Sequence, residues 1–249
     1  MPIHGNHLAW QFGNFAVPCF RAYRDHILAD VLSGYAKIAK HAQRVAHEAY
    51  HEMGAQFAGE DYGGDLGDAA EATTEEGQVY YEVLAGMRQA TINLHAAGLF
   101  HLLEQQLGDL LHRVRNSEHA NIAAKELGSD IHAFAKSYRR YLGLDLETLS
   151  QWSKIDELRL VANAVKHGKG KSEAQLRLKR PDLFEPPIWA ALGLASVSMR
   201  EEPLRVPLAG DGLFVTEAVF TEYATSVYEF VLEILAHFRR NTGTLYRCG

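Results

Sequence analysis

Apolar residues recur at the three- to four-residue spacing of an α-helix along two long stretches of the chain. The first stretch covers residues 20–57 and the second covers residues 80–114. Between them, the acidic and glycine-rich run GEDYGGDLG at residues 59–67 has no periodicity and predicts a loop over residues 58–74. Two long amphipathic helices joined by a loop predict an antiparallel helical hairpin.

Shorter elements are predicted after this hairpin. Apolar spacing and the glycines that follow it indicate helices over residues 119–127, 130–142 and 154–167. Ser129 is the expected cap of the second of these helices. The third has the sharpest boundaries, because Ser153 and Asp156 form a capping-box pattern at its start and Gly168 stands at its end.

The chain beyond this helix is predicted to be less regular. Residues 168–216 contain a basic turn, several prolines and two short apolar runs, at 204–208 and 213–216, that flank the turn sequence AGDG. These two runs predict a small β-hairpin, and a last amphipathic helix is predicted over residues 217–240. The predicted fold is therefore an all-α antiparallel bundle built on the two-helix hairpin, with a β-hairpin insertion before the last helix.

Composition indicates a globular protein with one large domain or two small ones, and we predict a single domain over residues 1–249 with an N-terminal arm at residues 1–18. The chain is 47% apolar and 22% charged, which excludes disordered and collagen-like proteins. Its two cysteines, Cys19 and Cys248, lie near opposite ends and provide neither a disulfide framework nor a CxxC zinc pair. Because no leader-like or membrane-length apolar segment occurs, we expect a cytoplasmic protein that does not enter the membrane.

Charge is unevenly distributed along the sequence. The net charge of −6 argues against a protein that coats nucleic acid through bulk electrostatics. Between Lys154 and Arg180, however, eight basic and three acidic residues give a local charge of +5. A cationic patch on an acidic protein favours a confined anionic ligand over a long duplex.

Residues 47–51 read HEAYH and match the HExxH motif, in which two histidines hold zinc and the glutamate acts as a general base. Phe57 occupies the position at which a related motif places its third histidine, and no Met-turn follows. The motif also lies near the end of a long predicted helix, on its polar side. We therefore interpret His47, Glu48 and His51 as a solvated helix face, predict no metal, and rank a zinc protease last.

A second grouping of polar side chains lies on the predicted helix 154–167. One arc of that helix, beside its apolar stripe, carries Asp156, Arg159, Asn163, Lys166 and His167. A guanidinium can hold two phosphate oxygens, an amide can orient a phosphate, and an imidazole can exchange a proton at neutral pH. These groups suffice for metal-independent RNA cleavage by the ribose 2′-hydroxyl, although a solvated face would have the same pattern.

The run RLVANAVKHG at residues 159–168, late in the chain and behind a long helical hairpin, resembles the HEPN superfamily. The following KRPDLF at residues 179–184 is similar to a bacterial branch of that superfamily. HEPN domains are all-α and carry an R-x4-6-H motif, and many are metal-independent ribonucleases of toxin–antitoxin and antiviral systems. Here seven residues separate Arg159 from His167, and Ala162 stands where the family's arginine often stands. Because residues four apart share a helix face, Arg159, Asn163 and His167 still align.

The resemblance implies a metal-independent endoribonuclease of the toxin or antiphage-defence type, without a cofactor. His167 would act as acid and base, Arg159 and Lys166 would neutralise the scissile phosphate, and Asn163 would orient it. Glu104 is similar to the acidic residue that many such domains place near the motif and is the fifth predicted catalytic residue. The expected substrate is single-stranded or loop RNA.

Assembly and partners follow from the same resemblance. One motif helix provides one histidine, whereas phosphodiester transfer needs an acid and a base, so a homodimer that pairs two motif helices is expected. In that dimer, Asp156 or Glu104 would lie near His167 and offset the repulsion between cations. An antitoxin or defence-system protein is a further expected partner. The alternative is a catalytically silent HEPN-like module whose polar helix face binds a partner protein or a nucleotide.

Overall fold

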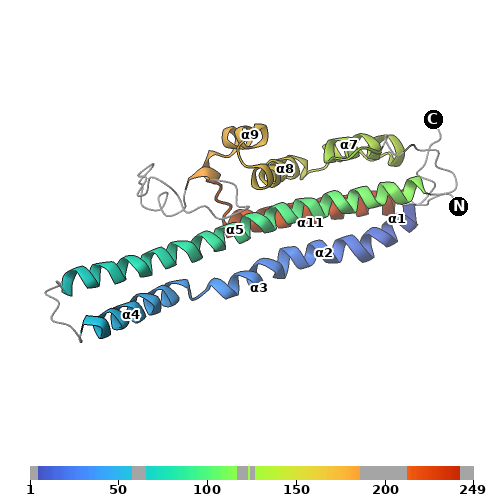
Figure 1. Cartoon of the computed structure of the whole chain (residues 1–249). Helices are drawn as coiled ribbons and strands as arrows, with labels where there is room; N and C mark the ends of the chain where they lie inside the picture. The colour runs from blue at the N-terminus through green and yellow to red at the C-terminus, as the bar shows by residue number, and fades with distance from the viewer. Residues whose placement is uncertain (1–4, 58–65, 117–122, 124–126, 186–211, 242–249) are drawn as a thin grey trace.

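The structure is a computed structural model that describes residues 5–57, 66–116, 123, 127–185 and 212–241. Every regular element within these ranges is helical, which confirms the prediction of an all-α protein. The longest element is α5 (Leu66–Arg115), and helices from both the preceding and the following parts of the chain pack against it (Figure 1).

Residues 5–18 are helical and form part of the core, so the prediction of these residues as an arm is wrong. Helices α1 (Gly5–Gln11), α2 (Val17–Ala22) and α3 (Leu28–Leu32) are joined by π-helical turns at Phe12–Ala16 and Tyr23–Ile27. The side chains of Leu8, Phe12 and Phe20 are buried. A glycine is required at position 5, because a Cβ there would collide with the backbone carbonyl of Asn241 at the end of the last helix.

The long helix predicted over residues 20–57 is interrupted in the structure. A 3-10 turn at Ser33–Tyr35 separates α3 from α4 (Ile38–Phe57). The hydroxyl of Ser33 donates a hydrogen bond of 2.7 Å to the carbonyl of Asp30, and Gly34 follows. A side chain that competes for a backbone carbonyl beside a glycine disturbs a helix at that point, which explains the break.

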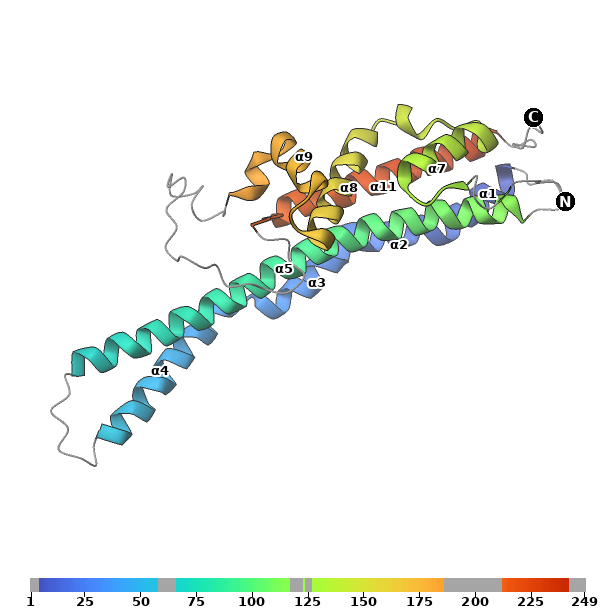
Figure 2. The ribbon, with the colours of Figure 1, turned by 45° about the horizontal axis from the view of Figure 1, so that its top comes forward.

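Helix α4 packs beside the first half of α5, and Figure 2 shows these two helices projecting together from the rest of the molecule. A Cβ at Gly77 would lie 2.7 Å from the Cβ of Ala46, so the two helices approach closely there. Helix α5 begins at Leu66, and residues 66–74 are therefore helical where a loop was predicted.

The second half of α5 forms the centre of the core. Leu99, Leu103 and Leu107 are fully buried under the N-terminal run and the helices that follow α5. Helix α11 (Glu217–Arg240) has the predicted bounds, because the Thr216 hydroxyl caps its first turn at the amide of Val219. The buried apolar side of α11 contacts both α8 and α5, and its burial stabilises their packing.

Three helices lie over this part of α5, namely α7 (Ile131–Ser137), α8 (Trp152–His167) and α9 (Lys171–Lys179) (Figure 1). The cap of α7 is Asp130 and not Ser129, because the Asp130 carboxylate accepts hydrogen bonds from two amides of the first turn. Helix α8 starts after Gln151 without a side-chain cap, so the capping box predicted at Ser153 is wrong. Gly168 has φ +63° and ends α8 as predicted.

No strand occurs in the part of the chain that the structure describes, so the predicted β-hairpin is not observed. Its first arm, residues 204–208, lies outside the described residues. The second arm, residues 213–216, forms no strand, and its backbone groups bond to side chains of α5 and to the carbonyl of Leu183. Buried Asn93 of α5 bonds the carbonyl of Leu213 at 2.8 Å and the amide of Val215 at 3.2 Å. The side-chain amide of Asn93 thus makes the backbone hydrogen bonds that a neighbouring strand would otherwise make.

Candidate functional site

Helix α8 is buried on most of its circumference, between α5, α9 and α11. Only one arc of its last three turns reaches solvent, and it contains the five residues that the sequence grouped together. Asp156, Arg159 and Asn163 are half-buried on this arc, whereas Lys166 and His167 are exposed. The arc predicted from helical periodicity is therefore the side of α8 that reaches solvent, and the other sides of this helix are buried.

The N-terminal half of the arc is neutralised by its own carboxylate. Arg159 donates to Asp156 at 2.9 Å through Nε and at 2.8 Å through a terminal nitrogen. His132 of α7 and Lys179 of α9 also approach Asp156, at 3.4 and 3.9 Å. The guanidinium of Arg159 therefore has a carboxylate partner already and is less available to a phosphate.

The C-terminal end of the arc has the opposite character. Five of the eight basic residues between positions 154 and 180 pair with acidic side chains: Lys154, Arg159, Arg177, Lys179 and Arg180. The other three, Lys166, Lys169 and Lys171, form no ion pair with any residue that the structure describes. They lie within six residues of one another around Gly168, beside exposed His167. The unneutralised positive charge of the segment is thus concentrated at the end of α8.

An open depression on α5 receives one residue of the arc. Its lining consists of Tyr23, Gly98, His101, Leu102, Glu104, Gln105 and Lys166. His101 and Glu104, one helical turn apart, are joined by a bond of 3.3 Å between Nδ1 and Oε2. Burial raises the pKa of the Glu104 carboxyl above its ordinary range, while the hydrogen bond from His101 opposes this shift. The structure therefore brings two predicted site residues, Glu104 and Lys166, into one depression.

The two carboxylates expected near His167 occupy different places. Asp156 lies eleven positions before His167 on the same helix, about 16 Å away along the axis. Glu104 shares the depression with Lys166, the neighbour of His167. Sequence reasoning missed His101, and its only signal was the spacing of three residues from Glu104, which places both on one face of a helix.

The HExxH residues lie away from this site, on exposed positions of α4. The rings of His47 and His51 are 4.4 Å apart, and Glu48 pairs with Arg44 at 3.1 Å. Within the described residues, no group of three or more His, Cys, Asp or Glu side chains is arranged to hold a metal ion. His47, Glu48 and His51 are exposed on α4, as expected for a solvated helix face.

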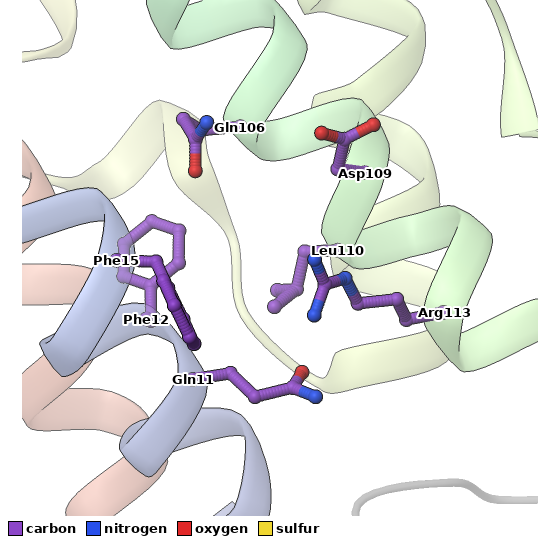
Figure 3. A pocket seen from close by; sticks show the side chains of 7 residues that line it. All are labelled: Gln11, Phe12, Phe15, Gln106, Asp109, Leu110 and Arg113. Atoms are coloured by element: carbon purple, nitrogen blue, oxygen red, sulfur yellow. The ribbon is translucent and has the colours of Figure 1, made fainter.

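A second, smaller cleft lies between the N-terminal run and the end of α5 (Figure 3). Phe15 and Gln11 line it from one side and Gln106, Asp109 and Arg113 from the other, above Phe12 and Leu110. None of the predicted site residues is among them. The cleft has no proton-transfer group of the histidine type, so the candidate site stays at α8 and the depression beside it.

Comparison of the chain with family models, with curated proteins and with solved structures gives no match in any of the three. In the described part of the chain, no helix has the length and apolar character needed to cross a membrane.

Proposed function

We propose that this chain is a HEPN-like, metal-independent endoribonuclease with His167 as an acid/base group. The observation that carries the proposal is the end of α8, where an exposed imidazole lies among three cations that have no acidic partner in the described structure. An imidazole can transfer a proton at neutral pH, and unpaired ammonium groups attract and hold a phosphodiester. The toxin or antiphage-defence setting comes from the sequence resemblance.

The geometry favours different roles for the two cations named by the sequence. Lys166 is exposed and unpaired within the described residues, so it is the better ligand for a non-bridging phosphate oxygen. Arg159 instead holds Asp156 and positions the middle of the arc. Asn163 lies one turn before His167 and can donate its amide to the same phosphate.

The substrate best suited to this surface is single-stranded or looped RNA. In-line attack by a 2′-hydroxyl needs a backbone that can bend at the scissile linkage. The unpaired cations of residues 154–180 lie at the end of one helix on a protein of net charge −6, which is too small a surface to hold a duplex. The same exposed helix end is where two copies would meet in the homodimer that we expect.

The function is tested directly by incubating the purified protein with an end-labelled single-stranded RNA of mixed sequence and with the same RNA as a duplex. We expect cleavage of the single strand, cyclic 2′,3′-phosphate ends, no cleavage of the duplex, and the same rate with and without EDTA. Cleavage abolished by EDTA would contradict the mechanism. RNA that is bound but never cut would show the silent interaction module instead.

Substitution of the two cations should give unequal effects. Lys166→Ala should lower kcat about 10²-fold, the loss usual for one charged group that stabilises a reacting oxyanion. Arg159→Ala should lower it less than about 10-fold, since its guanidinium is engaged by Asp156. Lys136→Ala, an exposed lysine on α7, is the charge-matched control and should have no effect. A greater loss of kcat in Arg159→Ala than in Lys166→Ala would show that Arg159, and not Lys166, binds the phosphate.

A further inference from the structure

We propose that His101 of α5 is a second catalytic acid/base of the same reaction, positioned by Glu104, so that one chain contains both proton-transfer groups. This inference rests on the proposed ribonuclease function and deepens it. It replaces the requirement that a second copy of α8 supply the missing group. The supporting observations are the His101–Glu104 pair, the depression that it lines, and Lys166 at the edge of that depression.

A carboxylate hydrogen-bonded to one ring nitrogen of His101 leaves the other ring nitrogen to act as the base. An ionised carboxylate can only accept, so His101 donates its Nδ1–H to Oε2 of Glu104, at 3.3 Å. This bond fixes the tautomer and leaves Nε2 with its lone pair free for a substrate. The His101 side chain is 44% exposed and that of Glu104 is 23% exposed, so the imidazole is the more accessible group of the pair.

The depression gives this nitrogen access to the cationic end of α8. Lys166 enters the lining from α8, whereas His101 and Gln105 enter it from α5. Gly98 leaves space in the floor: a Cβ at that position would lie 3.4 Å from the hydroxyl of Tyr23. A phosphodiester bound by Lys166 would therefore lie over α5, within the surface that His101 lines.

The proposed step conserves protons and electrons. Neutral His101 takes the proton of the ribose 2′-hydroxyl at Nε2 while O2′ forms a bond to phosphorus. The bond from phosphorus to O5′ breaks, and protonated His167 gives its proton to O5′. The products are a 2′,3′-cyclic phosphate and a 5′-hydroxyl, with Lys166 balancing charge on a non-bridging oxygen.

The groups that face His101 set how the reaction depends on pH. They are Glu104 on its own helix, Lys166 of α8 and Tyr23 of the N-terminal run, while Asp130 of α7 acts on Glu104. Because burial raises the pKa of Glu104, its carboxylate is protonated at a less acidic pH than an exposed glutamate. A protonated Glu104 oxygen would no longer accept the Nδ1–H of His101, so the pair keeps its orientation only while the carboxylate is ionised.

The first test compares two histidines of α5. His101→Ala should lower kcat about 10²- to 10⁴-fold, the usual contribution of one acid/base group. His112→Ala, an exposed histidine outside the depression, should retain full activity. Glu104→Gln should lower kcat less than His101→Ala does and move the ascending limb of the pH–rate profile to lower pH, since an amide does not stabilise the imidazolium. An unchanged profile in Glu104→Gln would overturn its positioning role.

A substrate with a sulfur atom in place of O5′ separates the two roles. A thiolate leaves without a proton, because a thiol has a pKa of about 8.5. This substrate should restore cleavage by His167→Ala, which lacks the acid, and should not restore cleavage by His101→Ala, which lacks the base. Equal cleavage of ordinary RNA by wild type and His101→Ala would overturn this inference alone, whereas failure of the wild type to cut RNA would overturn the proposed function.

Mixing the two inactive variants shows whether one chain holds the whole site. If His101 and His167 of one chain act together, a mixture of His101→Ala and His167→Ala protein stays inactive, since every site lacks one group. If they act across two chains, mixed dimers contain one intact site and activity returns. Recovery of activity would overturn the single-chain site.

Discussion

Replacement of His167 by Ala should lower kcat for RNA cleavage about 10²- to 10⁴-fold without loss of the fold. The imidazole is exposed at the last position of α8 and has no partner among the described residues, so truncation removes no packing. Substitutions at such surface positions usually change the free energy of unfolding by less than about 0.5 kcal/mol. Single-turnover kinetics and a thermal melt of the same preparation measure the two quantities together.

The matched control for this variant is the double substitution His47→Ala and His51→Ala on α4. It removes the two exposed histidines of the HExxH sequence match. We expect wild-type cleavage and wild-type stability. If the double variant lost activity and bound zinc together, the site would lie at the HExxH motif and the ribonuclease proposal would fall.

Local signals in the sequence were sufficient where one residue decides the structure. The end of α8 follows from Gly168, whose positive φ few other residues adopt, and the start of α11 predicted from periodicity is where Thr216 caps the helix in the structure. The polar arc of α8 follows from periodicity alone, because α5, α9 and α11 bury the remaining sides of that helix.

Features that depend on distant contacts could not be predicted in this way. The segment 213–216 reads as a strand, but the side chain of Asn93, more than a hundred residues away, satisfies its backbone groups. The sequence placed Arg159 and Lys166 together as phosphate ligands, whereas the structure pairs Arg159 with Asp156 one turn earlier on α8, and His132 of α7 and Lys179 of α9 also approach that carboxylate. His101 lines the same depression as Lys166 because α8 packs against α5. No local sequence pattern predicts that packing.

A buried carboxylate holds the elements around the site in place. Glu157 of α8 is 5% exposed and accepts a hydrogen bond of 2.8 Å from the hydroxyl of Tyr223 of α11. Arg180 also donates to it from the end of α9 and pairs with Asp182 as well. Burial, and then the charge of Glu157, raise the pKa of the Tyr223 hydroxyl, which keeps its proton for this bond. Through these contacts Glu157 joins α8, α9 and α11.

Replacement of Glu157 by Ala should therefore lower the free energy of unfolding by about 3–5 kcal/mol, because it leaves Arg180 half-buried without its interior partner. For a chain of this size, that loss corresponds to a fall in Tm of roughly 6–20 °C. Glu157→Gln keeps an oxygen for the Tyr223 hydroxyl and should lose less. Glu48→Ala removes an exposed glutamate from a pair with Arg44 and should lower stability by less than about 1 kcal/mol. If thermal melts showed the same Tm for Glu157→Ala and Glu48→Ala, the buried cluster would not be what fixes α9 and the cationic turn against α8.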